Sequence, residues 1–177
     1  MPEIVYVTEM METESLLEEL CPPVRNWFKD KFPDFTHPQK VAIPRIMAGD
    51  HLLLCSPTGS GKTLTAFLSV INDLVSRSLD GSLDNSVQCM YISPIKALAN
   101  DIQKNLIGPL TDIKENYLPS NSKDITVGLR TGDTPQKDRE RMLKKPPHIL
   151  ITTPESLGLA LASKRFRPLL NNMKWMI

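Results

Sequence analysis

The stretch that most constrains the fold is "HLLLCSPTGSGKTLTAFLSV", residues 51–70. A short apolar run is followed by a loop that contains Gly59 and Gly61, and then by apolar residues at helical spacing. A loop of this kind, between a strand and a helix, directs several backbone N–H groups at one spot, where the helix dipole adds roughly half a positive charge. The stretch therefore predicts a strand over residues 51–55, a helix that begins near residue 62, and an anion site between them.

The loop also indicates which anion binds. Its two glycines let the backbone curl closely around phosphate oxygens, Lys62 can reach the terminal phosphates, and the Thr63 hydroxyl is placed to coordinate Mg²⁺. A serine stands where the general pattern begins with glycine, and a small residue suffices there. An ordinary strand-to-helix turn is the alternative. The residues assigned to phosphate binding are Ser56, Pro57, Thr58, Gly59, Ser60, Gly61, Lys62 and Thr63, with Lys62 and Thr63 as the catalytic pair and Thr63 as the metal ligand.

Apolar strand patterns and helical patterns then alternate to the end of the chain. Strands are expected at residues 87–93, 125–130, 148–152 and 174–177, and helices at residues 94–107, 134–145 and from 153 onward. Strands separated by helices of this length argue for a parallel sheet covered on both faces. The fold class predicted is α/β, in one domain that spans residues 35–177.

Residues 1–34 are predicted to form a helical extension to that domain. Residues 14–20 and 24–32 read as two short amphipathic helices separated by two prolines, and they are expected to pack on the sheet domain. The segment "EIVYV" at residues 3–7 fits either an edge strand or a loose end.

Composition narrows the class of protein. There are 21 Lys plus Arg against 20 Asp plus Glu, a net charge of +1, so any contact with nucleic acid must be local. The three cysteines include no CxxC pair, and Cys55 and Cys89 lie in apolar runs where a buried, reduced thiol is expected. No apolar run approaches the roughly 20 residues that cross a bilayer. A cytoplasmic protein without a membrane partner is therefore expected.

Gln39, upstream of the loop, suggests that the bound nucleotide contains adenine. Gln39 lies 23 residues before Lys62 in "FTHPQKVAIPRI", and a glutamine amide can both donate to and accept from the edge of adenine. A surface glutamine is the alternative. Phe32 and Phe35 fit either contact with the base or core packing.

Three further segments place polar residues at predicted strand ends, which form the ligand edge of an open parallel sheet. They are "SPIKALAND" from Ser93, "RTGDTP" from Arg130 and "TTPES" from Thr152. Hydroxyl, ammonium and amide groups suit contacts with phosphate or ribose. Taken alone, the last two segments also fit plain helix capping, with Thr152 and Glu155 as a capping box, and Lys96 fits a solvated helix residue.

These segments, in this order, resemble those of superfamily-two helicases with tandem RecA-like lobes, and their wording is most similar to the large helicase-related (Lhr) family. The resemblance implies the N-terminal part of the first RecA-like P-loop lobe, ATP and Mg²⁺ as cofactors, 3′ to 5′ movement on single-stranded DNA or RNA, action on DNA or RNA–DNA hybrids, and a second lobe as partner. Gln39 matches the Q motif. The residues implied to bind nucleic acid are Ser93, Pro94, Lys96, Asn100, Arg130, Thr131, Gly132, Asp133, Thr153, Pro154 and Glu155.

One expected element is missing from the sequence. The family continues into a strand closed by Asp-Glu (Walker B), whose carboxylates hold Mg²⁺ and position water, and this chain contains no Asp-Glu dipeptide. We therefore interpret it as the incomplete front part of a helicase motor, unable to hydrolyse ATP alone. The alternatives are a Ski2-like or DEAD-box RNA helicase lobe, a non-helicase P-loop NTPase that needs only the loop, and a non-catalytic nucleic-acid adaptor.

Overall fold

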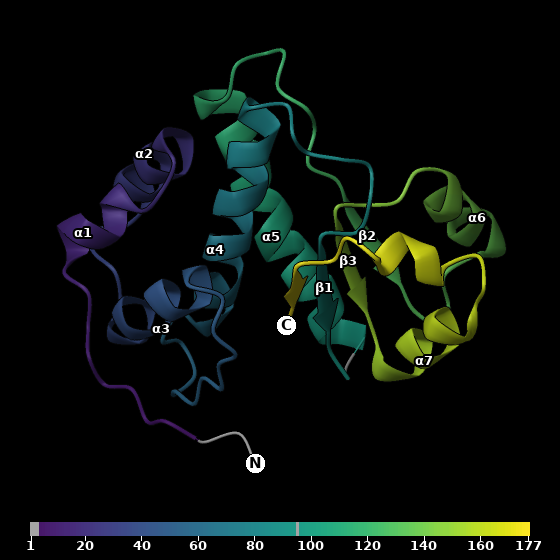
Figure 1. Ribbon diagram of the computed structural model, residues 1–177, viewed down its shortest axis with the longest axis horizontal. Helices are drawn as coiled ribbons and strands as arrows, with labels where there is room; N and C mark the ends of the chain where they lie inside the picture. Colours follow the sequence, from purple (N-terminus) through teal and green to yellow (C-terminus); the bar gives the residue numbers. More distant parts are fainter. Residues whose placement is uncertain (1–3, 95) are drawn as a thin grey trace. The chain divides into compact units, whose positions relative to one another are not determined.

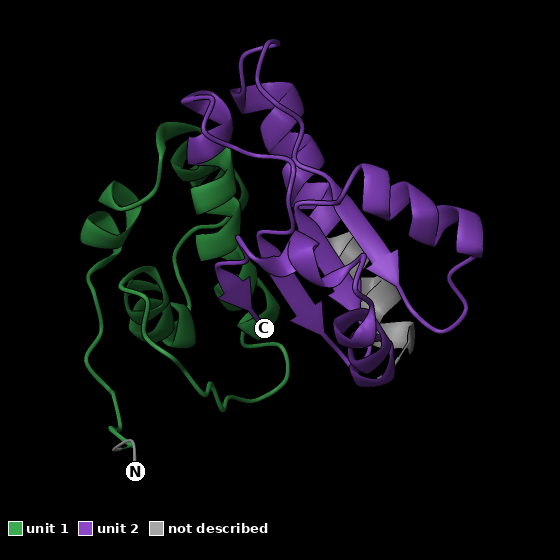
Figure 2. Ribbon diagram, turned by 45° about the vertical axis from the view of Figure 1, so that its right-hand side comes forward, with its two compact units in different colours: residues 1–75 green, residues 76–177 purple. Residues whose placement is uncertain are grey.

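The structure, a computed structural model, describes residues 4–94 and 96–177, with the backbone alone for residues 96–105. The chain divides into two compact units, residues 1–75 and residues 76–177 (Figure 2). The boundary falls within α4, a helix that runs over Lys62–Leu79. Each unit is described by itself below.

The first unit is helical. It contains α1 (Thr13–Glu18), α2 (Pro22–Lys31), α3 (His37–Met47) and most of α4 (Figure 1). Both predicted N-terminal helices are thus confirmed, and α2 has Pro22 in its first turn, where a missing N–H costs nothing. Residues 4–10 have no regular structure, and the side chain of Tyr6 is 91% exposed, so this segment is a loose end and not an edge strand.

The N-terminal helices are joined to the two helices that follow them. The backbone N–H of Cys21 donates to the Oδ1 of Asn72 on α4, at 2.7 Å. Asp34 accepts hydrogen bonds from Thr13 and from Lys40, whose Nζ lies 2.8 Å away. The hydrogen bond from Lys40 is the main reason that the pKa of Asp34 falls to about 2. These contacts tie α1 and α2 to α3 and α4 within the same unit.

The aromatic residues of this unit form a small cluster beside α2. Phe28 and Phe35 are stacked, with ring centroids 4.0 Å apart, and Phe35 is only 4% exposed. Phe32 packs edge-on against Trp27 with its centroid at 5.7 Å. Of the two interpretations open for Phe35, core packing is the one that the structure supports.

The second unit is built on a parallel sheet of four strands in the order β2-β3-β1-β4. The strands are β1 (Cys89–Ile92), β2 (Val127–Arg130), β3 (Ile149–Thr152) and β4 (Trp175–Met176), and each falls within a predicted strand. The helices are α5 (Lys96–Tyr117), α6 (Gln136–Lys144), α7 (Pro154–Ala162) and the 3-10 helix η1 (Arg167–Leu170). The predicted parallel α/β arrangement is confirmed.

Helices lie on both sides of this sheet, α5 on one and α6 and α7 on the other (Figure 1). Met90 and Leu150 are register partners on β1 and β3, and they share a core with Met142 of α6, Ala160 of α7 and Phe166. Because side chains alternate along a strand, Cys89, Ile149 and Ile151 point to the opposite face, and all three are fully buried.

The strand predicted before the phosphate loop is not formed. Residues 51–57 have no regular structure, and no described residue pairs with them in a ladder. Leu53 is 88% exposed, so the apolar run has neither the partner strand nor the covering helices that a buried strand requires. The expectation that Cys55 is buried fails for the same reason, whereas Cys89 is buried as predicted.

The longest helices are α4, with 18 residues, and α5, with 22 residues. Both helices carry charged residues along their length, and Pro109 lies inside α5. Among the described residues, no helix combines the length and the apolar character needed to cross a bilayer.

Candidate functional site

The phosphate loop has the backbone geometry that its glycines predict. Gly59 has a φ of +80° and Gly61 a φ of +86°, both in the left-handed region that favours glycine. The loop leads directly into α4, which begins at Lys62. The first N–H groups of this helix have no partner within the helix and lie beside the loop, as an anion site requires.

Lys62 folds back over this loop. Its Nζ donates hydrogen bonds to the backbone carbonyl oxygens of Ser56 and Pro57, while the hydroxyls of Ser56 and Ser60 bond to one another. The ammonium group is therefore already positioned within the loop, and a phosphate bound there would compete with two carbonyls for its protons. Thr63, in the first turn of α4, is exposed.

Gln39 lies against the same loop, in the first turn of α3. Its side chain is 3% exposed, and its Oε1 accepts a hydrogen bond from the backbone N–H of Thr36 at 2.8 Å. Its Nε2 lies 2.8 Å from the position that a Cβ on Gly61 would occupy. The hydroxyl of Thr36 donates to the carbonyl of Ser60 at 2.9 Å, so a second contact joins the start of α3 to the phosphate loop.

A pattern that accounts for part of this geometry was present in the sequence. Thr36 and Gln39 are spaced as the first and last residues of a capping box, in which the glutamine side chain accepts from the N-cap backbone. The amide oxygen of Gln39 is therefore engaged locally, and its Nε2 is the group that faces the loop.

The second unit brings the three predicted nucleic-acid segments to one edge. Ile92 and Arg130 are both in register with Thr152, so their strands end level with one another. The backbone N–H of Ser93 donates to the carbonyl of Thr152 at 3.0 Å, and the hydroxyl of Thr152 donates to the carbonyl of Arg130 at 2.8 Å. Ser93, Thr131 and Thr153 therefore follow the strands along one edge of the sheet.

Residues at this edge differ in exposure. The hydroxyl-bearing residues are covered, with Ser93 at 3%, Thr131 at 7% and Thr153 at 4% exposed. Five residues present their surface to solvent: Pro94, Gly132, Asp133, Pro154 and Glu155. The cap of α7 is Thr153, whose hydroxyl accepts from the backbone N–H of Ser156 at 3.4 Å. The capping box expected from Thr152 and Glu155 is thus not formed, because the Thr152 hydroxyl is used within the sheet and the N-cap is Thr153, one residue later.

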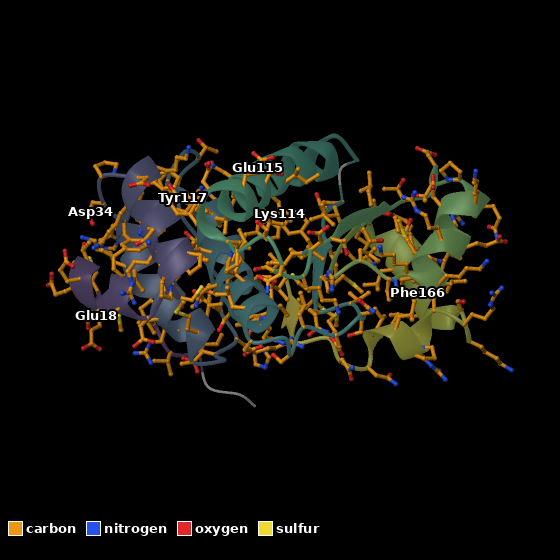
Figure 3. The ribbon with its side chains drawn as sticks, turned by 90° about the horizontal axis from the view of Figure 1, so that it is seen from above. Glu18, Asp34, Lys114, Glu115, Tyr117 and Phe166 are labelled. Atoms are coloured by element: carbon orange, nitrogen blue, oxygen red, sulfur yellow. The ribbon has the colours of Figure 1, made fainter. Side chains whose placement is uncertain are left out.

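Arg130 does not lie on this exposed rim. It is 9% exposed, and its Cζ sits 4.2 Å from the centroid of the Phe166 ring. Phe166 itself lies among the side chains of the second unit (Figure 3), in the core that includes Met90 and Leu150. Burial, and then the charge of Arg139, lower the pKa of Arg130 from its usual value. The side chain is therefore part of the packing of the second unit.

The loop after Arg130 is held by Thr134, which belongs to the segment "RTGDTP", and by Arg139, which sequence reasoning missed. The guanidinium of Arg139, on α6, donates to the carbonyl oxygens of Thr134 at 2.8 Å, Gly132 at 2.8 Å and Thr131 at 3.3 Å. The hydroxyl of Thr134 accepts from the backbone N–H of Thr131 at 2.8 Å. These bonds fix the loop over residues 131–134. No periodicity signals them, because each depends on how the loop folds.

Two predicted nucleic-acid residues, Lys96 and Asn100, have side chains that lie outside the described residues. The nucleotide residues belong to the first unit and the edge residues to the second. No cluster of His, Cys, Asp and Glu that could hold a metal ion occurs among the residues whose side chains are described.

Residues 36–177 match the DEAD/DEAH box helicase family. The chain belongs to this family. Its sequence is 48% identical, over 93% of the chain, to a protein of Sulfolobus acidocaldarius named ATP-dependent helicase Lhr-Core. It is 46% identical, over 100% of the chain, to the Lhr-Core helicase of Methanocaldococcus jannaschii. The resemblance to Lhr helicases is thus confirmed.

Solved structures agree with this assignment. The Mycobacterium smegmatis helicase Lhr, solved with ssDNA and AMP-PNP, superposes with a TM-score of 0.79 at 41% identity, over 89% of this chain and 20% of that one. The RecA-like helicase fold is therefore confirmed. This chain covers only 18% of the length of the Sulfolobus acidocaldarius relative and 21% of the length of the Methanocaldococcus jannaschii relative.

Proposed function

We propose that this chain is the ATP- and nucleic-acid-binding portion of an ATP-dependent helicase that moves 3′ to 5′ on DNA or RNA–DNA hybrids. Residues 35–177 would form its first RecA-like lobe, residues 1–34 a helical extension, and a second RecA-like lobe its partner. The Lhr names of the relatives and the ssDNA and AMP-PNP in the solved Lhr structure support this proposal. The free thiols fit a cytoplasmic location.

The observation that carries the proposal is the contact between Gln39 and the phosphate loop. The amide of Gln39 is buried beside Gly61, and this supports a role for its Nε2 as a hydrogen-bond donor to the base of a nucleotide whose phosphates the loop would hold. An ordinary P-loop enzyme requires the loop but not this glutamine. The arrangement favours an adenine nucleotide.

The other roles follow from chemistry at the loop. Lys62 would exchange its carbonyl partners for phosphate oxygens, which are stronger acceptors because they are charged. The exposed Thr63 would supply a hydroxyl to Mg²⁺, which neutralises phosphate charge when bound. The remaining loop residues, 56–61, would cradle the phosphates with their backbone N–H groups.

The edge of the second unit would hold the backbone of a single strand. The exposed residues there, 132–133 and 154–155, sit beside Ser93, Thr131 and Thr153, and Lys96 and Asn100 would add a cation and an amide. We assign Arg130 to supporting this edge through Phe166. Contacts of this kind position a strand without reading its sequence.

Titration of ATP and GTP analogues tests the nucleotide site. The parent chain is expected to prefer the ATP analogue, and Gln39→Ala should remove that preference at a cost on the order of 1–3 kcal/mol. Equal affinity for the two nucleotides in the parent chain would contradict the role of Gln39.

Turnover and strand binding provide separate tests. Because the chain lacks an Asp-Glu pair to position water, it should hydrolyse ATP no faster than a Lys62→Ala variant, with or without a strand. Single strands should bind without sequence preference, and Lys96→Ala should weaken all of them equally. A strand-stimulated ATPase that Lys62→Ala abolishes would refute the proposed lack of turnover.

A further inference from the structure

Charge is unevenly distributed along the chain. Residues 134–177 carry nine Lys and Arg against three Asp and Glu, a net charge of +6. Residues 1–133 carry twelve against seventeen, a net charge of −5. The near-neutral total therefore hides a strongly basic segment, which belongs to the second unit.

Part of this charge forms a stripe along α6. Lys137, Arg141 and Lys144 follow one another at i, i+4 and i+7, so they share one face of the helix over roughly 10 Å. All three are exposed, and they lie opposite Met142, which is buried in the core. The stripe therefore points away from the sheet into solvent.

The stability of the helix does not account for the whole stripe. Arg141 and Lys144 lie in the last turn, where the helix dipole favours cations. Lys137 lies in the first turn, where the dipole disfavours a cation, and Lys137 and Arg141 are like charges one turn apart. Within the stripe, Arg141 forms an ion pair with Asp138, with 3.9 Å between the guanidinium nitrogen and the carboxylate oxygen. A bound anion would offset the repulsion.

A second group of cations lies on the same flank of the second unit. Lys164, Arg165 and Arg167 are exposed on the segment that follows α7. They surround Phe166, which is fully buried in the same core as Met142 of α6. Figure 1 shows α6 and this segment together at the end of the unit that carries α7. The stripe and this group are together called the basic face.

The composition of the basic face indicates which polyanion it fits. Sites that hold a single strand through its bases combine cations with exposed aromatic rings on which those bases stack. The aromatic residues after Pro135 are Phe166, which is buried, and Trp175, which is half-buried on β4. A face of cations without a stacking platform suits a duplex, whose bases are already stacked and whose phosphates are on the outside.

The stripe also has the right extent and position. B-form DNA carries one charge per about 1.7 Å of its axis, so roughly six phosphate charges lie along a stripe of this length. The loop over residues 131–134 leads from the strand-end edge into α6, whose first turn contains Lys137. The stripe thus begins beside the edge proposed to hold a single strand and extends away from it.

We propose that the basic face binds the phosphate backbone of duplex nucleic acid, as a surface separate from the strand-end edge. This inference rests on the proposed function in one respect: if the strand-end edge holds a single strand, the basic face, which begins next to that edge, would contact the adjoining duplex. The contact involves no base readout, and its strength depends on the number of phosphates neutralised.

The proposal is tested by measuring the affinity of the 177-residue chain for a blunt DNA duplex, and for a single strand of equal length, at several salt concentrations. The variants Lys137→Gln/Lys144→Gln and Lys164→Gln/Arg165→Gln each remove two charges from the basic face. Each should reduce the slope of log affinity against log salt for the duplex by about 0.9 for every phosphate that the variant no longer neutralises, and leave the single strand unchanged. The matched control, Lys29→Gln/Lys31→Gln on α2, removes the same charge elsewhere and should change neither.

Several outcomes would overturn the proposal. One is a salt slope that falls equally for the duplex and the single strand in the variants of the basic face. Another is an equal fall of the duplex slope in the α2 control. Both results would indicate only a general electrostatic effect. Competition by polyglutamate as effective as that by the duplex would indicate an acidic protein partner. Duplex binding that depends on the basic face in a chain that binds no single strand would support this inference while refuting the strand-end edge.

Discussion

The side-chain Nε2 of Gln39 lies 2.8 Å from the place where a Cβ on Gly61 would stand. The backbone of Gly61 also has a φ of +86°, which residues other than glycine adopt only with strain. Backbone strain therefore favours glycine at position 61, and a Cβ there would in addition displace the amide end of the Gln39 side chain. Gly59 has a φ of +80° and nothing within 4 Å of its own missing Cβ, so backbone strain alone favours glycine there.

This pair of glycines allows a matched experiment. Gly59→Ala should lower the free energy of unfolding by about 1–2 kcal/mol through backbone strain. Gly61→Ala should lower it further and, because it displaces Gln39, should also reduce the preference for ATP over GTP analogues. Urea denaturation and nucleotide titration measure the two effects. Equal losses in both variants, with base preference intact, would show that the Gln39 contact has no functional consequence.

The sequence predicted the second unit well because its signals are local. A continuous apolar run such as residues 149–151, followed by a proline at a helix start, specifies a buried strand and the helix after it. The same rule failed at residues 51–55, because an apolar run shows that a segment can be buried but does not supply a partner strand. Cys55 is exposed for that reason.

Of the candidate site, the sequence predicted the loop geometry and the common edge, but not how individual side chains are used. The position of Gln39 was foreseeable in part from the capping pattern with Thr36. The stacking of Arg130 on Phe166 joins residues 36 positions apart, and the three carbonyls that Arg139 contacts converge only after the loop has folded. Such long-range contacts leave no periodic pattern in a sequence.

The role of Arg139 can be separated from its charge. Arg139→Gln should free the loop over residues 131–134, since charge-assisted hydrogen bonds contribute about 1.5–3 kcal/mol. Faster amide hydrogen exchange in this loop, measured without nucleic acid, and weaker single-strand binding are expected. Arg139→Lys should restore part of the protection.

Arg141→Gln on the same helix is the control, because it removes the same charge from a side chain that is 77% exposed. Its loop should exchange at the rate of the parent chain. If both glutamine variants accelerate exchange equally, Arg139 acts through the stability of α6 and does not position the loop.

The three thiols should react in a fixed order. Cys55 is exposed, Cys21 is half-buried, and Cys89 is buried with a pKa raised to about 12 by desolvation. Because the thiolate is the reactive form, alkylation followed by mass spectrometry should modify Cys55 first and leave Cys89 unmodified until the chain unfolds. Cys55→Ser should remove the fast phase. A fast phase that persists in this variant would mean that residues 51–55 are more protected than the structure shows.

Stability should depend on pH through His148. This residue is 3% exposed, and its Nδ1 accepts from the backbone N–H of Thr126 at 3.0 Å. Its Nε2 has no hydrogen-bond partner among the residues that the structure describes. Burial, and next the charge of Lys123, hold the pKa of His148 below its usual 6.5, although Asp84 nearby opposes the shift and Arg77 adds to it. The folded chain thus keeps this imidazole neutral at a pH where the unfolded chain protonates it.

The sign of the effect follows from this difference. Above about pH 6.5 the imidazole is neutral in both states, so its stabilising contribution is fully present. As the pH falls from there toward the folded pKa, the unfolded chain binds a proton that the folded chain does not, and the free energy of unfolding decreases. Urea denaturation at several pH values should show this decrease in the parent chain and a smaller one in His148→Asn. His51→Asn, which alters an exposed histidine, is the control, and an unchanged pH dependence in His148→Asn would assign the effect to other groups.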